Sequence, residues 1–154
     1  MKHSYLMILV FATVFTVSAS SCIKDDEPII TEENSAMENG KIQITVNSQT
    51  FTATLLDNES AMAFKEILPL TIDMTELNSN EKYYDLPTSL PTNSSNPGTI
   101  KNGDLMLYGS KTLVLFYKSF STSYSYTKLG SVDDVTGLVA ALGSGNVSVS
   151  FQSE

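Results

Sequence analysis

Several residue types that supply catalytic and metal-binding groups are missing from this chain. It contains no arginine and no tryptophan, and its only histidine and only cysteine are His3 and Cys22. A single cysteine excludes an intramolecular disulfide. Beyond residue 22 there is also no histidine or cysteine for a Ser-His-Asp triad, a Cys-His pair or a histidine-type metal site. Carboxylates, lysines, hydroxyls and phenols remain as the groups for chemistry or binding.

Positive charge is also scarce. All nine basic residues are lysines, and the chain has 17 acidic residues, which gives a net charge of −8. Such a surface repels phosphate backbones and argues against a nucleic-acid partner. We interpret the acidic excess as a solubility coat rather than as a means of cation capture.

The chain is long enough for one well-formed core. Its 154 residues are 42% hydrophobic, and this length favours a single domain over two. Tyrosine, phenylalanine, valine, isoleucine and threonine are frequent, which favours a β-rich fold.

The first 21 residues have the pattern of a signal peptide. Lys2 precedes an apolar run from Tyr5 to Val17, which is shorter than the roughly 20 residues that a membrane-spanning helix needs. Small residues then lead directly to Cys22. This ending resembles a bacterial lipobox, although Ala19 stands where the usual pattern has leucine. The resemblance implies cleavage before Cys22 and attachment of lipid to its sulfur.

An ordinary secretory signal cleaved near Ala19 is the alternative, and it would leave Cys22 as a free thiol. We favour lipidation, because an unpaired exposed thiol is a liability in an oxidising compartment. Residues 22–40 are polar and acidic, and we expect them to form a disordered tether. The segment Ile23–Glu27 resembles the acidic export tag of some Gram-negative surface lipoproteins. We therefore expect a lipid-anchored protein of the bacterial cell envelope, in the outer membrane and exposed at the surface.

Alternating apolar and polar residues predict several strands with one wet face. Residues 41–46 and 51–55 alternate in this way around a turn at residues 47–50, which predicts a β-hairpin. Residues 70–74 and 146–151 show the same alternation and predict two further strands.

Two short helices are also predicted. Side chains suited to an N-cap at residues 57–60 begin the first helix, and Pro69 ends it. Asp133 caps the second helix, and Gly143 follows it as the C′ residue. The apolar positions of the second helix, at i, i+3, i+4 and i+7, are Val135, Leu138, Val139 and Leu142.

The most apolar part of the chain lies between Gly103 and Gly130. Its runs at residues 105–108 and 112–117 are continuously apolar, which predicts strands buried on both faces. Before them, residues 86–103 form a long loop with a short strand piece near Thr99–Ile100. About eight strands and two short helices predict a mostly β fold closed into a barrel, because closure removes exposed strand edges.

Short motifs spread over residues 41–151 carry a family resemblance. They are Leu68-Pro69-Leu70, Asn80-Glu81-Lys82-Tyr83, Leu86-Pro87, Leu90-Pro91, Gly98-Thr99-Ile100, Gly103-Asp104-Leu105, Tyr108-Gly109, Phe116-Tyr117 and Tyr126-Thr127-Lys128-Leu129-Gly130. Together they resemble the bacterial cyclophilin-like domain family of small β-barrel proteins. The resemblance implies a closed eight-stranded barrel with a helix at each open end. The domains are then a signal peptide (1–21), a lipidated tether (22–40) and the barrel (41–152).

The resemblance does not extend to the catalytic groups of true cyclophilins. Those enzymes isomerise X-Pro peptide bonds with an arginine set among histidine, tryptophan and other aromatic side chains. This chain has no arginine or tryptophan, and Lys118 does not replace a planar guanidinium donor. The resemblance therefore implies a fold without the isomerase activity.

Four carboxylates are candidates for acid–base work of the kind that hydrolyses glycosides. They are Glu76, Glu81, Asp85 and Asp104. Nothing in their spacing fixes a pair, so we interpret them as caps, turn acceptors and solvated charges. We expect Glu81-Lys82 to be an ion pair or hydrogen-bonding staple that fixes the long loop. No calcium loop of EF-hand spacing is present, and we expect no metal and no cofactor.

Residues 119–127 are the better candidate for a binding site, because Ser, Thr and Tyr alternate there with almost no aliphatic residue. The side chains can line a groove that stacks on a ligand and hydrogen-bonds to it. The alternative is a strand whose hydroxyls only keep it soluble. The candidate ligand-binding residues are Glu81, Tyr108, Tyr117, Phe120, Tyr124 and Tyr126.

Three functions follow from this sequence. The first is a membrane-anchored, non-catalytic module that binds a peptide, a glycan or a partner protein. The alternatives are a divergent peptidyl-prolyl isomerase and a structural subunit of a surface assembly.

Overall fold

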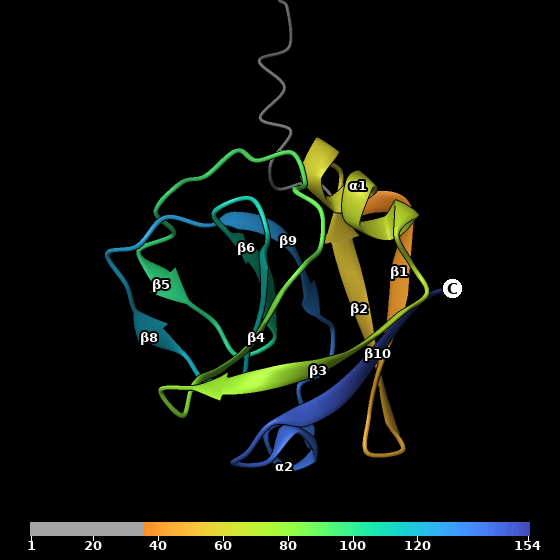
Figure 1. The fold of residues 1–154 in the computed structure, drawn as a ribbon, viewed down its shortest axis with the longest axis vertical. Helices are drawn as coiled ribbons and strands as arrows, with labels where there is room; N and C mark the ends of the chain where they lie inside the picture. Colours follow the sequence, from red (N-terminus) through yellow and green to blue (C-terminus); the bar gives the residue numbers. More distant parts are fainter. Residues whose placement is uncertain (1–35) are drawn as a thin grey trace, which may run out of the picture. The chain divides into compact units, whose positions relative to one another are not determined.

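The computed structural model describes residues 36–154, of which eight strands form a closed barrel (Figure 1). In order around the barrel they are β1 (Ala36–Val46), β10 (Val147–Ser153), β3 (Leu70–Leu77), β4 (Glu81–Asp85), β7 (Thr112–Phe116), β6 (Asp104–Tyr108), β9 (Thr127–Val132) and β2 (Gln49–Leu56). Neighbouring strands all pair antiparallel. The predicted eight-stranded barrel is therefore confirmed.

The two strands predicted for the first hairpin are confirmed, but their boundaries differ from the prediction. Asn47 and Ser48 form a two-residue turn with φ of 47° and 66°, because a tight hairpin of this kind needs two residues in the left-handed region. Gln49 and Thr50, predicted as turn residues, belong to β2. Strand β1 begins at Ala36, which pairs with Leu56. Residues 36–40 are therefore strand and not part of the disordered tether predicted for 22–40. The predicted signal peptide and Cys22 lie outside the described residues.

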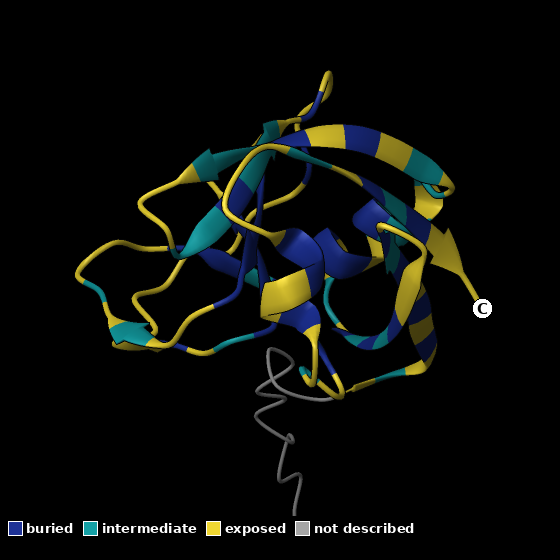
Figure 2. Cartoon of the chain, turned by 90° about the horizontal axis from the view of Figure 1, so that it is seen from below, coloured by how far each residue is buried: buried dark blue, intermediate teal, exposed yellow. Residues whose placement is uncertain are grey.

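The main core fills the barrel and is closed by a helix at each end. Buried and exposed residues alternate along the strands (Figure 2), so that Ile44, Val149 and Phe151 point inward. Helix α1 (Glu59–Glu66) adds Phe64, whose ring meets that of Phe151 edge to face at 5.7 Å. Helix α2 (Leu138–Leu142) contributes its own apolar residues at the opposite end.

The first predicted helix is confirmed, whereas the second begins later than expected. Asn58 caps α1, since its Oδ1 accepts a hydrogen bond from the backbone N–H of Ala61 at 2.8 Å. Helix α2 starts only after Gly137, so the prediction that Asp133 caps it is wrong. Asp133 instead bonds Lys41 Nζ at 2.7 Å and Thr54 Oγ1 at 2.6 Å. Those tertiary partners hold the carboxylate against β1 and β2.

A second, smaller core lies on the outer face of the barrel. Strand β5 (Thr99–Ile100) pairs with β8 (Phe120–Ser121) in a separate two-stranded sheet beside the barrel (Figure 1). Apolar side chains from these segments and from the outer face of β6 and β7 form one cluster: Ile100, Met106, Val114, Phe116 and Tyr126, with Tyr83 and Phe120 against them. The outer cluster explains why β6 and β7 are buried on both faces, as predicted.

Candidate functional site

A groove of about 550 Å³ borders the outer cluster. Alternate residues of β4 form part of its wall, because Glu81, Tyr83 and Asp85 face outward while Lys82 and Tyr84 face the barrel core. The remaining lining residues come from the end of β3 and the turn after it, β6, β7, β8 and the segment after β8: Leu77, Asn78, Asn80, Tyr108, Thr112, Val114, Phe120, Ser121, Thr122, Ser123, Tyr124 and Tyr126. The groove therefore runs between the barrel wall and residues 120–126.

Three tyrosines form a contiguous aromatic surface in this groove. Tyr108 lies in the middle, with its ring centroid 6.2 Å from that of Tyr124 and 5.6 Å from that of Tyr126. Tyr126 is buried, and its ring also meets Phe116 edge to face at 5.5 Å. Tyr108 and Tyr124 are 48% and 62% exposed, which is unusual for such large rings. The buried tyrosine positions the two exposed rings.

Backbone hydrogen bonds fix the segment that carries these aromatic residues. Ser95 and Tyr126 exchange two bonds, of 3.0 and 2.9 Å. The N–H of Thr122 donates to Gly98 O at 3.0 Å, and Thr122 Oγ1 accepts from the N–H of Tyr124 at 3.1 Å. The groove wall is thus tied to the loop around β5.

Glu81 is the partly buried charged group of the groove. The ion pairs of residues 36–154 join Lys41 to Asp133, Lys82 to Glu76 and Lys128 to Asp104, and none involves Glu81. Burial, and then the negative charge of Glu76, raise the pKa of Glu81 above its ordinary value. The protein therefore holds this carboxylate at the groove without neutralising it.

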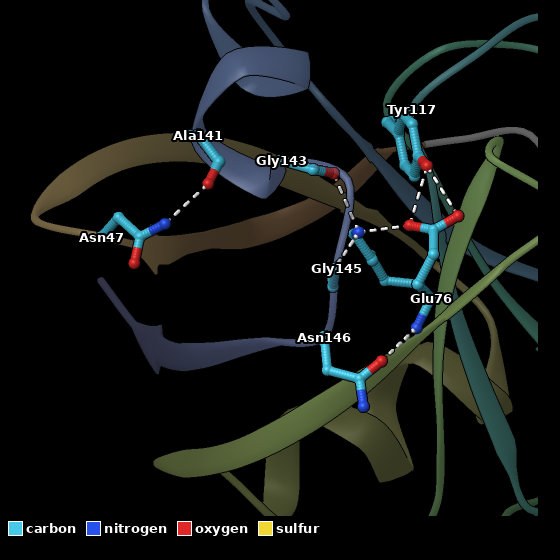
Figure 3. A network of polar contacts seen from close by, with 8 residues as sticks. Asn47, Glu76, Tyr117, Ala141, Gly143, Gly145 and Asn146 are labelled. Carbon is cyan, nitrogen blue, oxygen red and sulfur yellow. Dashed lines mark hydrogen bonds and ion pairs between the residues drawn. The ribbon is translucent and has the colours of Figure 1, made fainter.

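On the other face of β3 and β4, Glu76 and Lys82 form a buried ion pair. Tyr117 Oη donates to Glu76 at 2.8 Å, and Lys82 Nζ donates to the carbonyls of Gly143 at 3.0 Å and Gly145 at 2.6 Å (Figure 3). The Lys82 ammonium also lies 5.1 Å from the centroid of the Tyr117 ring. This network joins β3 and β4 to the loop between α2 and β10.

The pKa values of Glu76 and Tyr117 in this network are shifted in opposite directions. Burial acts to raise the pKa of Glu76, but hydrogen bonds from Lys82 and Tyr117 and the charge of Lys82 bring the pKa below its ordinary value. Burial and the hydrogen bond to Glu76 raise the pKa of Tyr117 to about 12. Glu76 is therefore held ionised and Tyr117 is held protonated, which suits a structural network.

The structure brings five of the six candidate ligand-binding residues together. Glu81, Tyr108, Phe120, Tyr124 and Tyr126 all line the groove. Tyr117 does not, because it points into the barrel core and bonds Glu76. Sequence reasoning missed other lining residues, notably Tyr83, Asn78 and Asn80. They come to the groove only through the pairing of β4 with β3 and β7.

The four candidate carboxylates are not gathered at one site. Glu76 belongs to the buried network, whereas Glu81 and Asp85 both line the groove. Asp85 Oδ1 accepts from Thr112 Oγ1 at 2.6 Å. Asp104 accepts from the N–H of Lys101 at 2.8 Å, as expected of a turn acceptor, and pairs with Lys128 at 2.8 Å. The expected Glu81-Lys82 staple for the long loop is wrong, because Lys82 pairs with Glu76 and its other bonds, to Gly143 and Gly145, fix the loop between α2 and β10.

Two features are absent from residues 36–154. No group of three or more His, Cys, Asp or Glu side chains in this part of the chain could hold a metal ion. None of its helices has both the length and the apolar character needed to cross a membrane.

The barrel, its two helices and its external groove define the class of protein, a small closed antiparallel β-barrel. The chain belongs to the cyclophilin-like family, whose family model matches residues 44–152. The solution structure of the hypothetical protein AF2241 from Archaeoglobus fulgidus is similar, with a TM-score of 0.57 and 16% identity over 74% of this chain and 94% of that one. That likeness concerns the fold alone. No curated protein matches the chain in sequence.

Proposed function

We propose that this protein is a lipid-anchored, non-catalytic binding module of the bacterial cell envelope, and that its groove binds a peptide, a glycan or a segment of a partner protein. The observation that carries the proposal is the groove with Tyr108 and Tyr124 exposed along it. Exposed tyrosines in a concave site supply apolar contact area together with hydroxyl groups that hydrogen-bond.

The groove has the chemistry of a binding site. A volume of about 550 Å³ falls in the usual range of roughly 300–1,000 Å³ for sites that bind small molecules. The tyrosine rings offer flat faces for stacking, and Ser121, Thr122 and Ser123 offer hydroxyls at the edge. Peptides and sugars both present the apolar faces and polar groups that such a surface complements.

The charged groups of the groove favour binding over turnover. They are the carboxylates of Glu81 and Asp85, and no lysine is among the lining residues. True cyclophilins use an arginine to stabilise the twisted amide, and no cationic side chain lines this groove. Family membership is the observation that favours the isomerase alternative.

A ligand screen tests the binding proposal. The full chain, purified in detergent and immobilised, is presented to a peptide library and a glycan array, alongside Tyr124→Ala. Hits of the wild-type chain should weaken about two- to fivefold or more in the variant, because a ring contact is removed. Met62→Ala is the control, since Met62 is also exposed, at 44%, but lies on α1 outside the groove. Hits that survive Tyr124→Ala unchanged contradict the proposal.

Tyr126 is a poorer probe than Tyr124, although both line the groove. Tyr126 is only 8% exposed and packs in the outer cluster. Its removal would therefore disturb folding as well as binding.

The lipid anchor is a separate part of the proposal and has its own test. Cys22 follows small residues that resemble a lipobox, and an acidic segment follows it. Growth of the expressing bacterium with labelled palmitate should label the wild-type chain and not Cys22→Ser. Label that persists in Cys22→Ser would contradict lipidation at this residue. Protease added to intact cells then distinguishes a surface location from a periplasmic one.

A further inference from the structure

We propose that the groove binds a peptide segment of a partner through a lysine or arginine side chain, whose cationic group is held between Glu81 and the tyrosine rings. The inference rests on the proposed function, because it names the ligand class of the same groove. Three observations carry it: an unneutralised carboxylate, rings that can face a cation, and a groove larger than one cationic group requires.

The first observation is the position of Glu81. Its carboxylate is partly buried in the groove wall, and no lysine pairs with it among the described residues. On the opposite face of the same strand, the chain surrounds the buried Lys82 with acceptors. Carboxylates are seldom fully buried unless they are paired, because removal from water disfavours the charged form, and the partly buried Glu81 carries part of that cost. A cation supplied by a ligand gives Glu81 the partner that the protein does not.

The second observation is the aromatic surface beside this carboxylate. Burial, and after it the negative charge of Glu81, raise the pKa of Tyr126, so the charge of Glu81 acts on the tyrosine cluster. Tyr126 contacts Tyr108, which contacts Tyr124. The face of a tyrosine ring attracts ammonium and guanidinium groups. A cation near Glu81 therefore gains both a carboxylate and ring faces.

The charge of the groove is complementary to such a ligand. Two carboxylates, Glu81 and Asp85, are among its lining residues, and no lysine is. The whole chain carries a net charge of −8 and contains no arginine. A basic segment is therefore attracted over distance as well as in contact.

The third observation is the size and edge of the groove, which favour a peptide over a small free cation. About 550 Å³ is the volume of a site for a drug-sized ligand, well beyond one ammonium group. Asn78, Asn80 and Ser121–Ser123 line the rest and can hydrogen-bond to peptide groups.

Calorimetric titration of the full chain in detergent tests the inference with matched peptides. The probes are acetyl-Ala-Lys-Ala-amide, its arginine analogue, and the analogue with norleucine, which keeps the four-carbon chain of lysine and lacks its ammonium group. The lysine and arginine peptides should bind at least about tenfold more tightly than the norleucine peptide, since hydrogen bonds to a charged group are the strong ones. Choline is titrated as a free organic cation and should bind more weakly than the lysine peptide.

Glu81→Gln identifies the residue responsible. The variant keeps the size of the side chain and removes its charge, so the lysine peptide should lose about tenfold in affinity while the norleucine peptide is unchanged. Glu66→Gln is the matched control, because Glu66 is exposed on α1, outside the groove, and the same charge is removed. A loss of equal size in both variants would indicate general electrostatics and contradict a site at Glu81.

A salt series with the wild-type chain gives a second readout that needs no variant. Raising the salt concentration from about 0.05 to 0.5 M should lower the affinity for the lysine peptide several-fold and leave the affinity for the norleucine peptide unchanged, because salt screens exposed charges. Equal affinity for lysine and norleucine peptides overturns the inference but leaves the binding proposal standing. Choline binding as tightly as the lysine peptide overturns the peptide as the ligand. No binding of any probe also overturns the inference, and the separate ligand screen then decides the binding proposal.

Discussion

Lys82 lies directly opposite Glu76 across strands β4 and β3, and its side chain has no exposed surface. All three donors of its ammonium group have acceptors: the Glu76 carboxylate and the carbonyl oxygens of Gly143 and Gly145. A charge so far from water persists only because these partners replace the lost hydration. The pair therefore ties the β3–β4 hairpin to the loop before β10, directly behind the groove wall.

The first prediction concerns this buried pair. Glu76→Gln leaves Lys82 charged, buried and without a counter-charge, which should lower the free energy of unfolding by about 3 kcal/mol. Chemical denaturation at pH 7 measures it. Asp73→Asn is the control, because Asp73 is exposed on the same strand and its change should stay within about 0.5 kcal/mol.

The lowered pKa of Glu76 makes the stability difference between the wild type and Glu76→Gln depend on pH. A carboxyl group with a lowered folded-state pKa stabilises the protein above its unfolded pKa, and the contribution is lost as pH falls through the folded value. The difference in free energy of unfolding between the wild type and Glu76→Gln should therefore shrink below about pH 4.5. A constant gap down to pH 2 would mean that the charge of Glu76 is not what compensates Lys82.

The second prediction concerns Tyr117, whose pKa is raised to about 12. In a spectrophotometric titration, the last phenol to ionise should do so near that pH, and Tyr117→Phe should remove this late step. A raised phenol pKa stabilises the fold below the unfolded value of about 10, and the contribution is lost as pH rises toward 12. Loss of the hydroxyl should lower the free energy of unfolding by about 1–2 kcal/mol. A late step that persists in Tyr117→Phe contradicts the assignment.

The third prediction concerns Glu81 and separates stability from function. The pKa of Glu81 is raised in the folded state. The ionised carboxylate therefore destabilises the fold at neutral pH. Below the pKa of the unfolded chain the group is protonated, and this cost disappears. Glu81→Gln should therefore raise the free energy of unfolding at pH 7 by about 0.5–1 kcal/mol, with solvent screening keeping the gain small. The gain should vanish below about pH 4. A destabilised variant would show that Glu81 supports the fold instead.

Sequence patterns predicted the strands that have one wet face and could not predict β4. Residues 41–46, 51–55, 70–74 and 146–151 alternate because apolar side chains fill the barrel there. In β4 the inward position is Lys82, which the core accepts only because Glu76 and two carbonyl oxygens surround it. An ion pair replaces an apolar contact, and the alternation disappears from the sequence.

The groove could be predicted in part, for a related reason. Tyr124 and Tyr126 stand out by residue type in a segment with almost no aliphatic residue. Tyr117 was placed with them wrongly, because β7 is buried on both faces and no alternation shows which residues point inward. Tyr83 reaches the groove through strand pairing, which local pattern does not encode.

The fourth prediction concerns isomerase activity. A protease-coupled assay with an X-Pro peptide should give the uncatalysed rate, since the chain has no arginine and the lining residues of the groove include no cationic donor. Tyr124→Ala should give the same rate. A wild-type rate well above background that falls in Tyr124→Ala would mean that the groove is an active site.

The location of the bound ligand is the most direct test of the groove as the binding site. An NMR titration of the labelled full chain in detergent, with the best peptide or glycan from the screen, reports which residues the ligand touches. We expect the largest shifts at Tyr108, Tyr124 and their neighbours on β4 and β8. Shifts centred instead on the second cavity, of about 330 Å³ and lined by residues such as Asn58, Asn93 and Lys101, would contradict the account.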